Sequence, residues 1–213
     1  MNDKELKEQL VNTTKELYQA GVITAKGGNV STRSADHENA VWITPSQIDK
    51  SSLTPELMVL IGFDGKKIMG ESRPSVESSY HAGLMQKRKD INAVVHTHAP
   101  LATIFGMINM EISPITSEAV FIMDYPKIPF YLGGSKDLAN AVLEKLGEGK
   151  MGGAFLCNHG LITVGKDLPI AAERTMMVEH VLHMLFTIKR LGLEPSILPE
   201  NAVKLLSQFA GAV

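Results

Sequence analysis

Apolar residues near the start of the chain recur at a spacing that predicts an amphipathic helix. Leu6, Leu10, Leu17 and Ala20 fall close to the helical period, and Gly21 follows them directly. Glycine is favoured just beyond the C-terminus of a helix because it adopts a left-handed backbone conformation without steric cost. We therefore expect the first helix to stop at Gly21.

Short apolar runs and longer periodic stretches alternate along the rest of the chain. Residues 57–70 predict a hairpin that turns at Asp64 and Gly65, and residues 153–165 predict two strands bent at 158–160. Other strands are expected directly after the turn at 27–28 and at 40–46, 92–98 and 127–132. Other helices are expected at 73–90 with Ser75 as N-cap, at 99–107, at 135–146 and from 168 to Gly192, which ends the longest helix.

The order of these elements predicts the fold class. Strands and helices are interleaved without a strict β-α-β rhythm, and the sequence shows no repeat, low-complexity tract or linker. The chain has 213 residues, of which 44% are hydrophobic, which suits one domain with a substantial core. We predict a single mixed α/β domain over residues 1–213.

Charge and cysteine content narrow the possible partners. The net charge of −2 provides no overall basic field for nucleic acid. Cys157 is the only cysteine, which excludes an internal disulfide and is typical of a cytosolic protein. The start of the chain is charged, unlike a signal peptide, and no run reaches the roughly 18 apolar residues that a membrane span needs. We expect a cytoplasmic protein without nucleic-acid or membrane partners.

Two histidines end the apolar run "VVHTHAP" at residues 94–100. Side chains two positions apart in a strand point to the same face, so His96 and His98 are expected to project together. Two convergent imidazoles suit a transition metal, and His159 in "CNHGLITV" offers a third. Three histidines with an open coordination position are typical of a catalytic metal site. The alternative interpretation is a pair of surface histidines at a strand end.

Glu77 is the fourth candidate ligand. We place it in the first turn of the 73–90 helix, where the helix dipole favours a carboxylate and lowers its pKa. Near a divalent ion it could bind the metal at rest and act as a base during turnover. The alternative is an ordinary glutamate of a first helical turn.

Three separated stretches have the chemistry of a phosphate site. "GGNVS" offers flexible backbone N–H groups and the Asn29 amide, "TPSQ" offers Ser46 and Gln47, and "RPSVE" offers Ser75 at a helix start. Each stretch alone is also typical of a turn or a helix cap. The chain has neither the phosphate-loop motif nor the dinucleotide motif, so we expect no nucleotide cofactor.

Taken together, "GGNVS", "ITPS", "PSVE", "VVHTHAP" and "NHGLITVG", in this order and spacing, resemble the class II aldolase/adducin family over nearly the whole chain. The resemblance implies a central mixed or antiparallel sheet flanked by helices in three αβα layers. It also implies a fourfold homotetramer with active sites between subunits. The family's metal ligands fall on Glu77, His96, His98 and His159, with one divalent zinc, manganese or cobalt ion per subunit. Its phosphate-binding positions fall on Gly28, Asn29, Ser46, Gln47, Ser75 and, through the backbone alone, Val76.

Departures from the family pattern bear on the substrate. Gln47 replaces a glycine and Val76 replaces a serine of the family motifs. A family tyrosine that donates a proton has no clear match in "PITSEAVFIMDYP", where Glu118 is the natural replacement and Tyr125 is a second candidate. Near the C-terminus, Phe209 stands where fuculose-cleaving members carry a tyrosine.

The resemblance implies a metal-dependent aldolase that cleaves a small phosphorylated sugar, a ketose 1-phosphate, into dihydroxyacetone phosphate and an aldehyde. 5-Deoxyribulose 1-phosphate or its 5-methylthio relative is preferred, with L-fuculose 1-phosphate as the other substrate. Alternatives on the same scaffold are a pentulose-phosphate 4-epimerase and a methylthioribulose-1-phosphate dehydratase. A non-enzymatic, adducin-like module is disfavoured because all three histidines are present.

Overall fold

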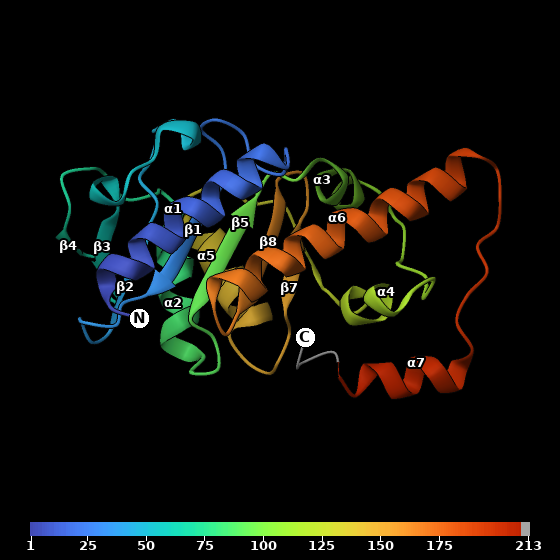
Figure 1. The fold of residues 1–213 in the computed structure, drawn as a ribbon. Coiled ribbons are helices and arrows are strands. Elements are labelled where there is room, and N and C mark those ends of the chain that lie inside the picture. Colours follow the sequence, from blue (N-terminus) through green and yellow to red (C-terminus); the bar gives the residue numbers. More distant parts are fainter. Residues whose placement is uncertain (210–213) are drawn as a thin grey trace.

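A mixed β-sheet forms the centre of the computed structural model, which describes residues 1–209 (Figure 1). In that part of the chain the sheet has eight strands in the order β4-β3-β2-β1-β5-β8-β7-β6. All neighbouring strands are antiparallel except β6 and β7, which are parallel. The strands are β1 Asn29–Arg33, β2 Ala40–Ile43, β3 Val59–Gly62, β4 Lys67–Met69, β5 Ala93–Thr97, β6 Lys127–Ile128, β7 Gly153–Leu156 and β8 Gly160–Gly165.

Helices cover both faces of the sheet and give three αβα layers. Helices α1, α3 and α6 pack on one face, and α2 and α5 pack on the other (Figure 1). The helices are α1 Asp3–Gln19, α2 Ser78–Lys87, α3 Pro100–Met107, α4 Ser117–Ile122, α5 Lys136–Leu146, α6 Leu168–Arg190 and α7 Glu200–Ser207. Two short 3-10 turns lie at η1 Lys50–Ser52 and η2 Pro55–Leu57. None of the described helices is long and apolar enough to cross a membrane.

The central strand β5 is buried on both faces, which explains its unbroken apolar sequence. Ala93 and Val95 belong to the core under α6, whereas Val94 belongs to the core under α2 and α5. Alternate side chains of the strand therefore belong to two different hydrophobic cores, one on each face of the sheet. The same alternation carries His96 and His98 to the end of the strand.

The predicted fold class and most predicted elements are confirmed. Helix α1 ends before Gly21, α6 ends before Gly192, and the hairpin of β3 and β4 turns at Asp64 and Gly65. The predicted strand at 127–132 is wrong beyond Ile128. Proline at 129 has no N–H to donate to a ladder, and the residues after it leave the sheet. The predicted domain includes 210–213, which lie outside the described residues.

Ser75 does not cap helix α2, so this prediction is wrong. The helix begins at Ser78 with Glu77 as its N-cap residue, and no side chain caps it. Pro74 pairs with Pro45 in an isolated bridge, and the N–H of Ser46 donates to the carbonyl of Arg73. This pairing holds 73–75 in an extended conformation outside the helix. The Ser75 hydroxyl instead accepts a hydrogen bond from the Glu77 N–H at 3.3 Å.

Candidate active site

Three histidine side chains converge at one end of the β5–β8 pair. His96 lies in β5, His98 follows that strand, and His159 lies in the turn between β7 and β8. Antiparallel pairing of β5 with β8 sets this turn beside the end of β5. The ring centroids are 4.8 to 5.2 Å apart, and the possible ligand atoms lie within 4.8 Å of one another. The predicted convergence of the three imidazoles is therefore present in the fold.

The tautomer of His96 leaves one ring nitrogen available for a ligand. Its Nδ1 lies 3.0 Å from the carbonyl of Leu161, which can only accept, so Nδ1 carries the proton. The buried Nε2 then presents a lone pair and has no hydrogen-bond partner within residues 1–209. A backbone carbonyl that fixes a histidine in this way is typical of the environment of a metal ligand.

Glu77 closes the fourth side of the cluster. Its side chain is only 5% exposed, with Oε2 at 3.3 Å from His96 Nε2 and Oε1 at 3.5 Å from His159 Nε2. Oε1 has no hydrogen-bond partner among the described residues. Lone pairs of a neutral imidazole and a carboxylate face each other across this gap, an arrangement that a cation between them stabilises.

A chain of hydrogen bonds positions the Glu77 carboxylate. Asn29 Nδ2 donates to Glu77 Oε2 at 2.8 Å, which turns the Asn29 carbonyl oxygen towards His81 Nε2. His81 must donate there, so its Nδ1 accepts from the Ser31 hydroxyl at 2.7 Å. The chain from Ser31 through His81 and Asn29 fixes the carboxylate from two elements, β1 and α2. His81 therefore contacts Glu77 only through Asn29.

Burial favours the neutral form of His96 and His98, which is the form that a metal requires. It lowers the pKa of His96 to about 4, although the neighbouring Glu77 carboxylate acts in the opposite direction. Burial also lowers the pKa of His98. For Glu77, burial alone would raise the pKa, but His96, the Asn29 hydrogen bond and His159 outweigh it and the pKa is lowered. Glu77 is also the N-cap residue of α2, where the helix dipole favours a carboxylate.

Comparison with known proteins places this geometry in a family. The profile of class II aldolase and adducin N-terminal domains matches residues 8–186. The chain belongs to the class II aldolase and adducin family. The 5-deoxy-D-ribulose 1-phosphate aldolase of Bacillus thuringiensis serovar kurstaki is 30% identical over 207 residues, which cover 96% of this chain and 95% of the relative.

Two further relatives show the range of this class II aldolase family. The 3-oxo-tetronate 4-phosphate decarboxylase of Haemophilus influenzae is 30% identical over 198 residues, covering 89% of this chain and 90% of the relative. A solved structure of an L-fuculose 1-phosphate aldolase superposes with a TM-score of 0.84 at 25% identity, covering 96% of this chain and 95% of the other. The fold is therefore shared with enzymes that cleave different carbon–carbon bonds.

A divalent metal fits the residues of this class II aldolase. The unpartnered His96 Nε2 and Glu77 Oε1 both face the cluster, and neutral imidazoles with a carboxylate are a donor set for first-row metals. His98 and His159 are only partly buried, so the cluster remains accessible from solvent.

The three stretches expected to bind phosphate do meet at one place. The bridge between Pro45 and Pro74 joins the 44–47 stretch to the 73–77 stretch, and Asn29 reaches Glu77 from the glycine-rich turn. The Asn29 side chain, however, is already bound to Glu77 and His81. Its amide therefore positions the carboxylate and is not left free for an anion.

The two departures from the family motifs have structural counterparts. Gln47 has a φ of +62°, in the left-handed region that favours glycine, which accounts for the glycine of other members at this position. Gln47 therefore has a strained backbone conformation, and in return the loop carries a polar side chain at this position. The Val76 side chain is 68% exposed, so it presents an apolar surface where a serine hydroxyl stands in the family motif.

Glu118 and Tyr125 are not brought to the three histidines. Glu118 is exposed in the first turn of α4, and His180 of α6 lies near it. Tyr125 belongs to the core, where burial raises its pKa to about 12, and it packs against Phe155. Within residues 1–209 no hydrogen bond, ion pair or ring contact joins either residue to the three histidines, so neither stands beside the cluster as a proton donor.

Two close backbone approaches were not predicted. A Cβ at Gly27 would lie 2.6 Å from His98 Nδ1, so glycine allows this turn to lie directly against the His98 ring. A Cβ at Gly133 would lie 3.7 Å from both Glu77 Oε1 and His159 Cε1, so the chain after β6 forms a wall of the site. The adjacent glycines at 27–28 and 133–134 were the available sequence signal, because paired glycines often mark close backbone approach.

Proposed function

We propose that this class II aldolase cleaves a ketose 1-phosphate between carbons 3 and 4, giving dihydroxyacetone phosphate and an aldehyde. The observation that carries the proposal is the buried Glu77 carboxylate, held 3.3 Å from His96 and 3.5 Å from His159. A fixed carboxylate beside three imidazoles has the chemistry to move a proton next to a carbonyl group. The preferred substrate is 5-deoxyribulose 1-phosphate or its 5-methylthio relative.

His96, His98 and His159, with Glu77 in the resting site, would hold one divalent ion, which we propose to be zinc ahead of manganese or cobalt. When bound, the ion supplies Lewis-acid stabilisation of the negative charge that cleavage leaves on the ketose fragment. All other steps fall to side chains and backbone groups of the protein.

The phosphate is proposed to bind between the loops that meet at the Pro45–Pro74 bridge. Ser46 and Ser75 offer hydroxyl groups, and Gly28, Gln47 and Val76 offer backbone N–H groups. An anchored phosphate presents carbons 2 and 3 to Glu77. Once the bond to carbon 4 has broken, Glu77 delivers a proton to carbon 3 of the enediolate. Glu77 is held for this role by the Asn29 amide.

Cleavage also requires a group that accepts the proton of the hydroxyl on carbon 4. Since Glu118 lies on the exposed side of α4, we propose that it serves this role only from a neighbouring subunit. This assigns the homotetramer a catalytic function, with each active site completed across an interface.

Few hydroxyl groups are available at the positions where the family pattern has tyrosine or serine, and this supports a deoxy substrate over L-fuculose 1-phosphate. Tyr125 is a core residue, Phe209 has no hydroxyl, and Val76 exposes an apolar side chain beside Gly134. A substrate with a methyl or methylthio end needs fewer polar partners than a fully hydroxylated sugar. The relative from Bacillus thuringiensis, similar over 207 residues, is named for a substrate of this kind.

Decarboxylation of a 3-oxo sugar-acid phosphate is the second candidate. Loss of carbon dioxide from such an acid leaves the same enediolate of dihydroxyacetone phosphate, and it needs no base for a carbon 4 hydroxyl. The absence of Glu118 and Tyr125 from the histidine cluster within one chain favours this reaction, as does the Haemophilus relative.

A panel of substrates tests the proposal. Metal-loaded protein is incubated with 5-deoxyribulose 1-phosphate, L-fuculose 1-phosphate and a 3-oxo-tetronate 4-phosphate, with and without chelator. Release of dihydroxyacetone phosphate is measured together with the aldehyde or the carbon dioxide. We expect aldehyde from the deoxy sugar and loss of activity with chelator. Carbon dioxide alone would establish the decarboxylase, and no triose phosphate from any substrate would refute both.

A further inference from the structure

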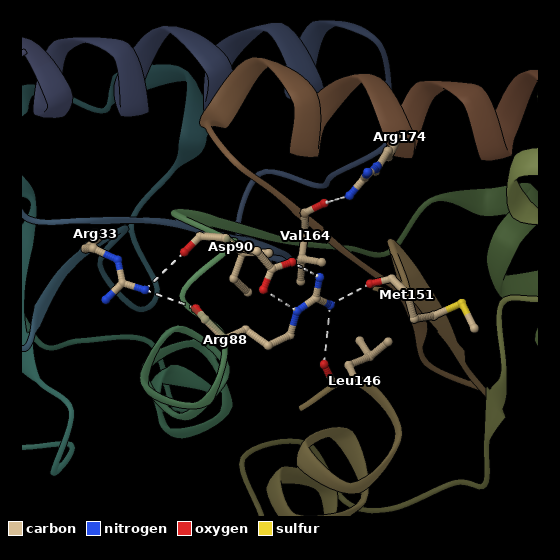
Figure 2. A network of polar contacts seen from close by, with 8 residues as sticks. Arg33, Arg88, Asp90, Leu146, Met151, Val164 and Arg174 are labelled. Carbon is tan, nitrogen blue, oxygen red and sulfur yellow. Dashed lines mark hydrogen bonds and ion pairs between the residues drawn. The ribbon is translucent and has the colours of Figure 1, made fainter. Parts of the chain in front are cut away.

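The buried arginines near the start of β5 show how this fold normally treats a buried polar group. Arg88 binds Asp90 through Nη2 at 2.6 Å and donates through Nη1 to the carbonyl of Met151 at 2.6 Å (Figure 2). Arg174 donates to the carbonyl of Val164 (Figure 2). Buried polar atoms are paired in this way in most proteins, so the few that are unpaired call for a physical explanation.

Unpaired polar atoms gather around the candidate metal site. Three of the five buried side-chain atoms without a hydrogen-bond partner in residues 1–209 are Glu77 Oε1, His96 Nε2 and the hydroxyl oxygen of Tyr80. The Tyr80 ring stacks on His81 with centroids 4.9 Å apart, and it meets His96 edge-on at 6.3 Å. A metal ion would occupy His96 Nε2 and the Glu77 carboxylate, but it would give the Tyr80 hydroxyl no acceptor.

Packing alone does not account for tyrosine as residue 80. The side chain is 1% exposed and belongs to the core under α2 and α5. Phenylalanine would fill the same space without the cost of burying an unpaired hydroxyl group. The hydroxyl therefore points to an acceptor that reaches it in a second arrangement of the site.

The Glu77 carboxylate is the acceptor that fits. Glu77 is the N-cap residue of α2, and Tyr80 is the third residue of the helix, a position whose side chain can reach back towards the N-cap. Burial raises the pKa of Tyr80, and the negative charge of Glu77 raises it further, so the two groups lie close together. Asn29 holds Glu77 Oε2, which leaves Oε1 free to turn towards the hydroxyl.

We infer that Tyr80 is a positioning residue, whose O–H group holds the Glu77 carboxylate in a second position away from the histidines. In the first position the carboxylate closes one side of the cluster, 3.3 Å from His96 and 3.5 Å from His159. In the second it accepts a hydrogen bond from Tyr80 and clears that side for a substrate. The inference rests on the proposed function, in which Glu77 binds the metal at rest and moves a proton during turnover. Tyr80 keeps its own proton and acts only through Glu77.

The variant Tyr80→Phe removes only the hydroxyl and tests the inference. The probe is acetohydroxamate, a bidentate metal ligand that needs the side of the cluster that Glu77 closes. Calorimetric titration of the zinc-loaded protein gives its Kd, and competition with a chelator gives the Kd for zinc. We expect the acetohydroxamate Kd to rise about tenfold, as the loss of one hydrogen bond to a carboxylate implies, and the zinc Kd to stay unchanged. With a cleaved substrate, kcat/KM should fall by a similar factor.

Two further variants separate this role from packing. In a Glu77→Ala background, Tyr80→Phe should leave the acetohydroxamate Kd unchanged, because the carboxylate through which Tyr80 acts is gone. Tyr18→Phe, at a half-buried tyrosine of α1 on the other face of the sheet, is the matched control and should behave like the unmodified protein.

Three results would overturn the inference about Tyr80. They are an unchanged acetohydroxamate Kd in Tyr80→Phe, a zinc Kd that rises together with it, and an equal effect in the Glu77→Ala background. Failure of acetohydroxamate to bind the unmodified zinc-loaded protein would also overturn it, because Glu77 would then not leave its first position. The substrate panel fails separately: no triose phosphate, with the expected acetohydroxamate result, would refute the proposed reaction and not the second position of Glu77.

Discussion

Glu77 illustrates how much of the site depends on the position of one carboxylate. It is 5% exposed and receives a 2.8 Å hydrogen bond from Asn29, and its second oxygen is left without a hydrogen-bond partner in the described part of the chain. Substitution of Glu77 by glutamine keeps the size and the oxygen acceptor but removes the proton transfer. This residue therefore separates metal binding from turnover.

We expect Glu77→Gln to lower kcat by about 10²- to 10⁴-fold, the usual contribution of a positioned acid–base group. The three histidines remain, so much of the metal should be retained. Triose phosphate release gives kcat, and elemental analysis of the same preparation gives the metal content. Full activity in Glu77→Gln would exclude an acid–base role for this residue.

His96→Ala should abolish metal binding and activity together. His96 is fully buried at the centre of the cluster, and its Nδ1 is fixed by the carbonyl of Leu161. His183→Ala, on the exposed side of α6, is the control and should retain both properties. Elemental analysis and the triose phosphate assay check both variants. Equal metal content in the two variants would show that His96 is not a ligand.

Lys50 makes the stability of the protein depend on pH in the alkaline range. Its side chain is 1% exposed, and burial lowers its pKa from 10.5 to about 8, although Asp49 acts in the opposite direction. Between pH 8 and 10.5 the unfolded chain binds more protons than the folded one. The contribution of Lys50 to the free energy of unfolding therefore rises with pH over this window, by on the order of 3 kcal/mol.

We expect Lys50→Met to unfold at higher denaturant concentration than the unmodified protein at pH 7, and the difference should shrink as pH approaches 10.5. Lys26→Met, which replaces an exposed lysine of the preceding loop, is the matched control and should show no such trend. Denaturant titrations at several pH values measure both variants. A pH-independent difference would mean that the pKa of Lys50 is the same in the folded and unfolded states.

At the scale of elements, the turn between β7 and β8 determines where His159 lies. Asn158 precedes the histidine with a φ of +58°, and the N–H of His159 donates to the carbonyl of Leu156 at 3.1 Å. Asparagine tolerates the left-handed conformation better than most residues do. The turn therefore combines a strained backbone with a candidate metal ligand.

Asn158→Val should destabilise the fold by roughly 1–2 kcal/mol, because a β-branched residue is strongly disfavoured at positive φ. It should also weaken metal binding, since the turn that carries His159 must shift. Asn158→Gly should bind metal normally. Thermal unfolding and metal titration of both variants test this, and a Val variant as stable as the Gly variant would contradict it.

Sequence patterns predicted the elements that depend on local signals. They failed where the structure depends on long-range contacts. The apolar run at 92–98 predicted β5, and the glycines at 21 and 192 predicted two helix ends. Ser75 was assigned as a cap, but the bridge between Pro45 and Pro74 is a long-range contact that sequence spacing does not contain. Helix α4 was missed because six residues are too few to establish a helical period.

The candidate ligands could be predicted from the sequence, but the residues that hold them in place could not. His96 and His98 share a strand, so their convergence follows from local geometry. Asn29 reaches Glu77 only because β1 pairs with β5 and α2 packs beside them, so its part in holding the carboxylate could not be predicted. The position of Glu118 away from the histidines of its own chain could not be predicted either, because α4 packs against α6 and α7.

At the scale of the whole molecule, we expect a homotetramer. The proposed reaction lacks a base for the carbon 4 hydroxyl within one chain, and a neighbouring subunit would supply it through Glu118. Light scattering should give a mass four times the 23.2 kDa of the chain. Glu118→Gln should lower kcat and leave that mass unchanged. A fully active monomer would contradict the shared site.

The antiparallel pairing of β5 with β8 also determines when the metal can bind during folding. His96 is bound to Leu161, 65 residues further along the chain, so the cluster exists only after these two strands have paired. An unfolded chain offers His96 and His98 alone, a much weaker chelate than the full set of ligands. The metal is therefore expected to bind late in folding, and it stabilises only chains in which these two strands have paired correctly. The bound ion also slows unfolding.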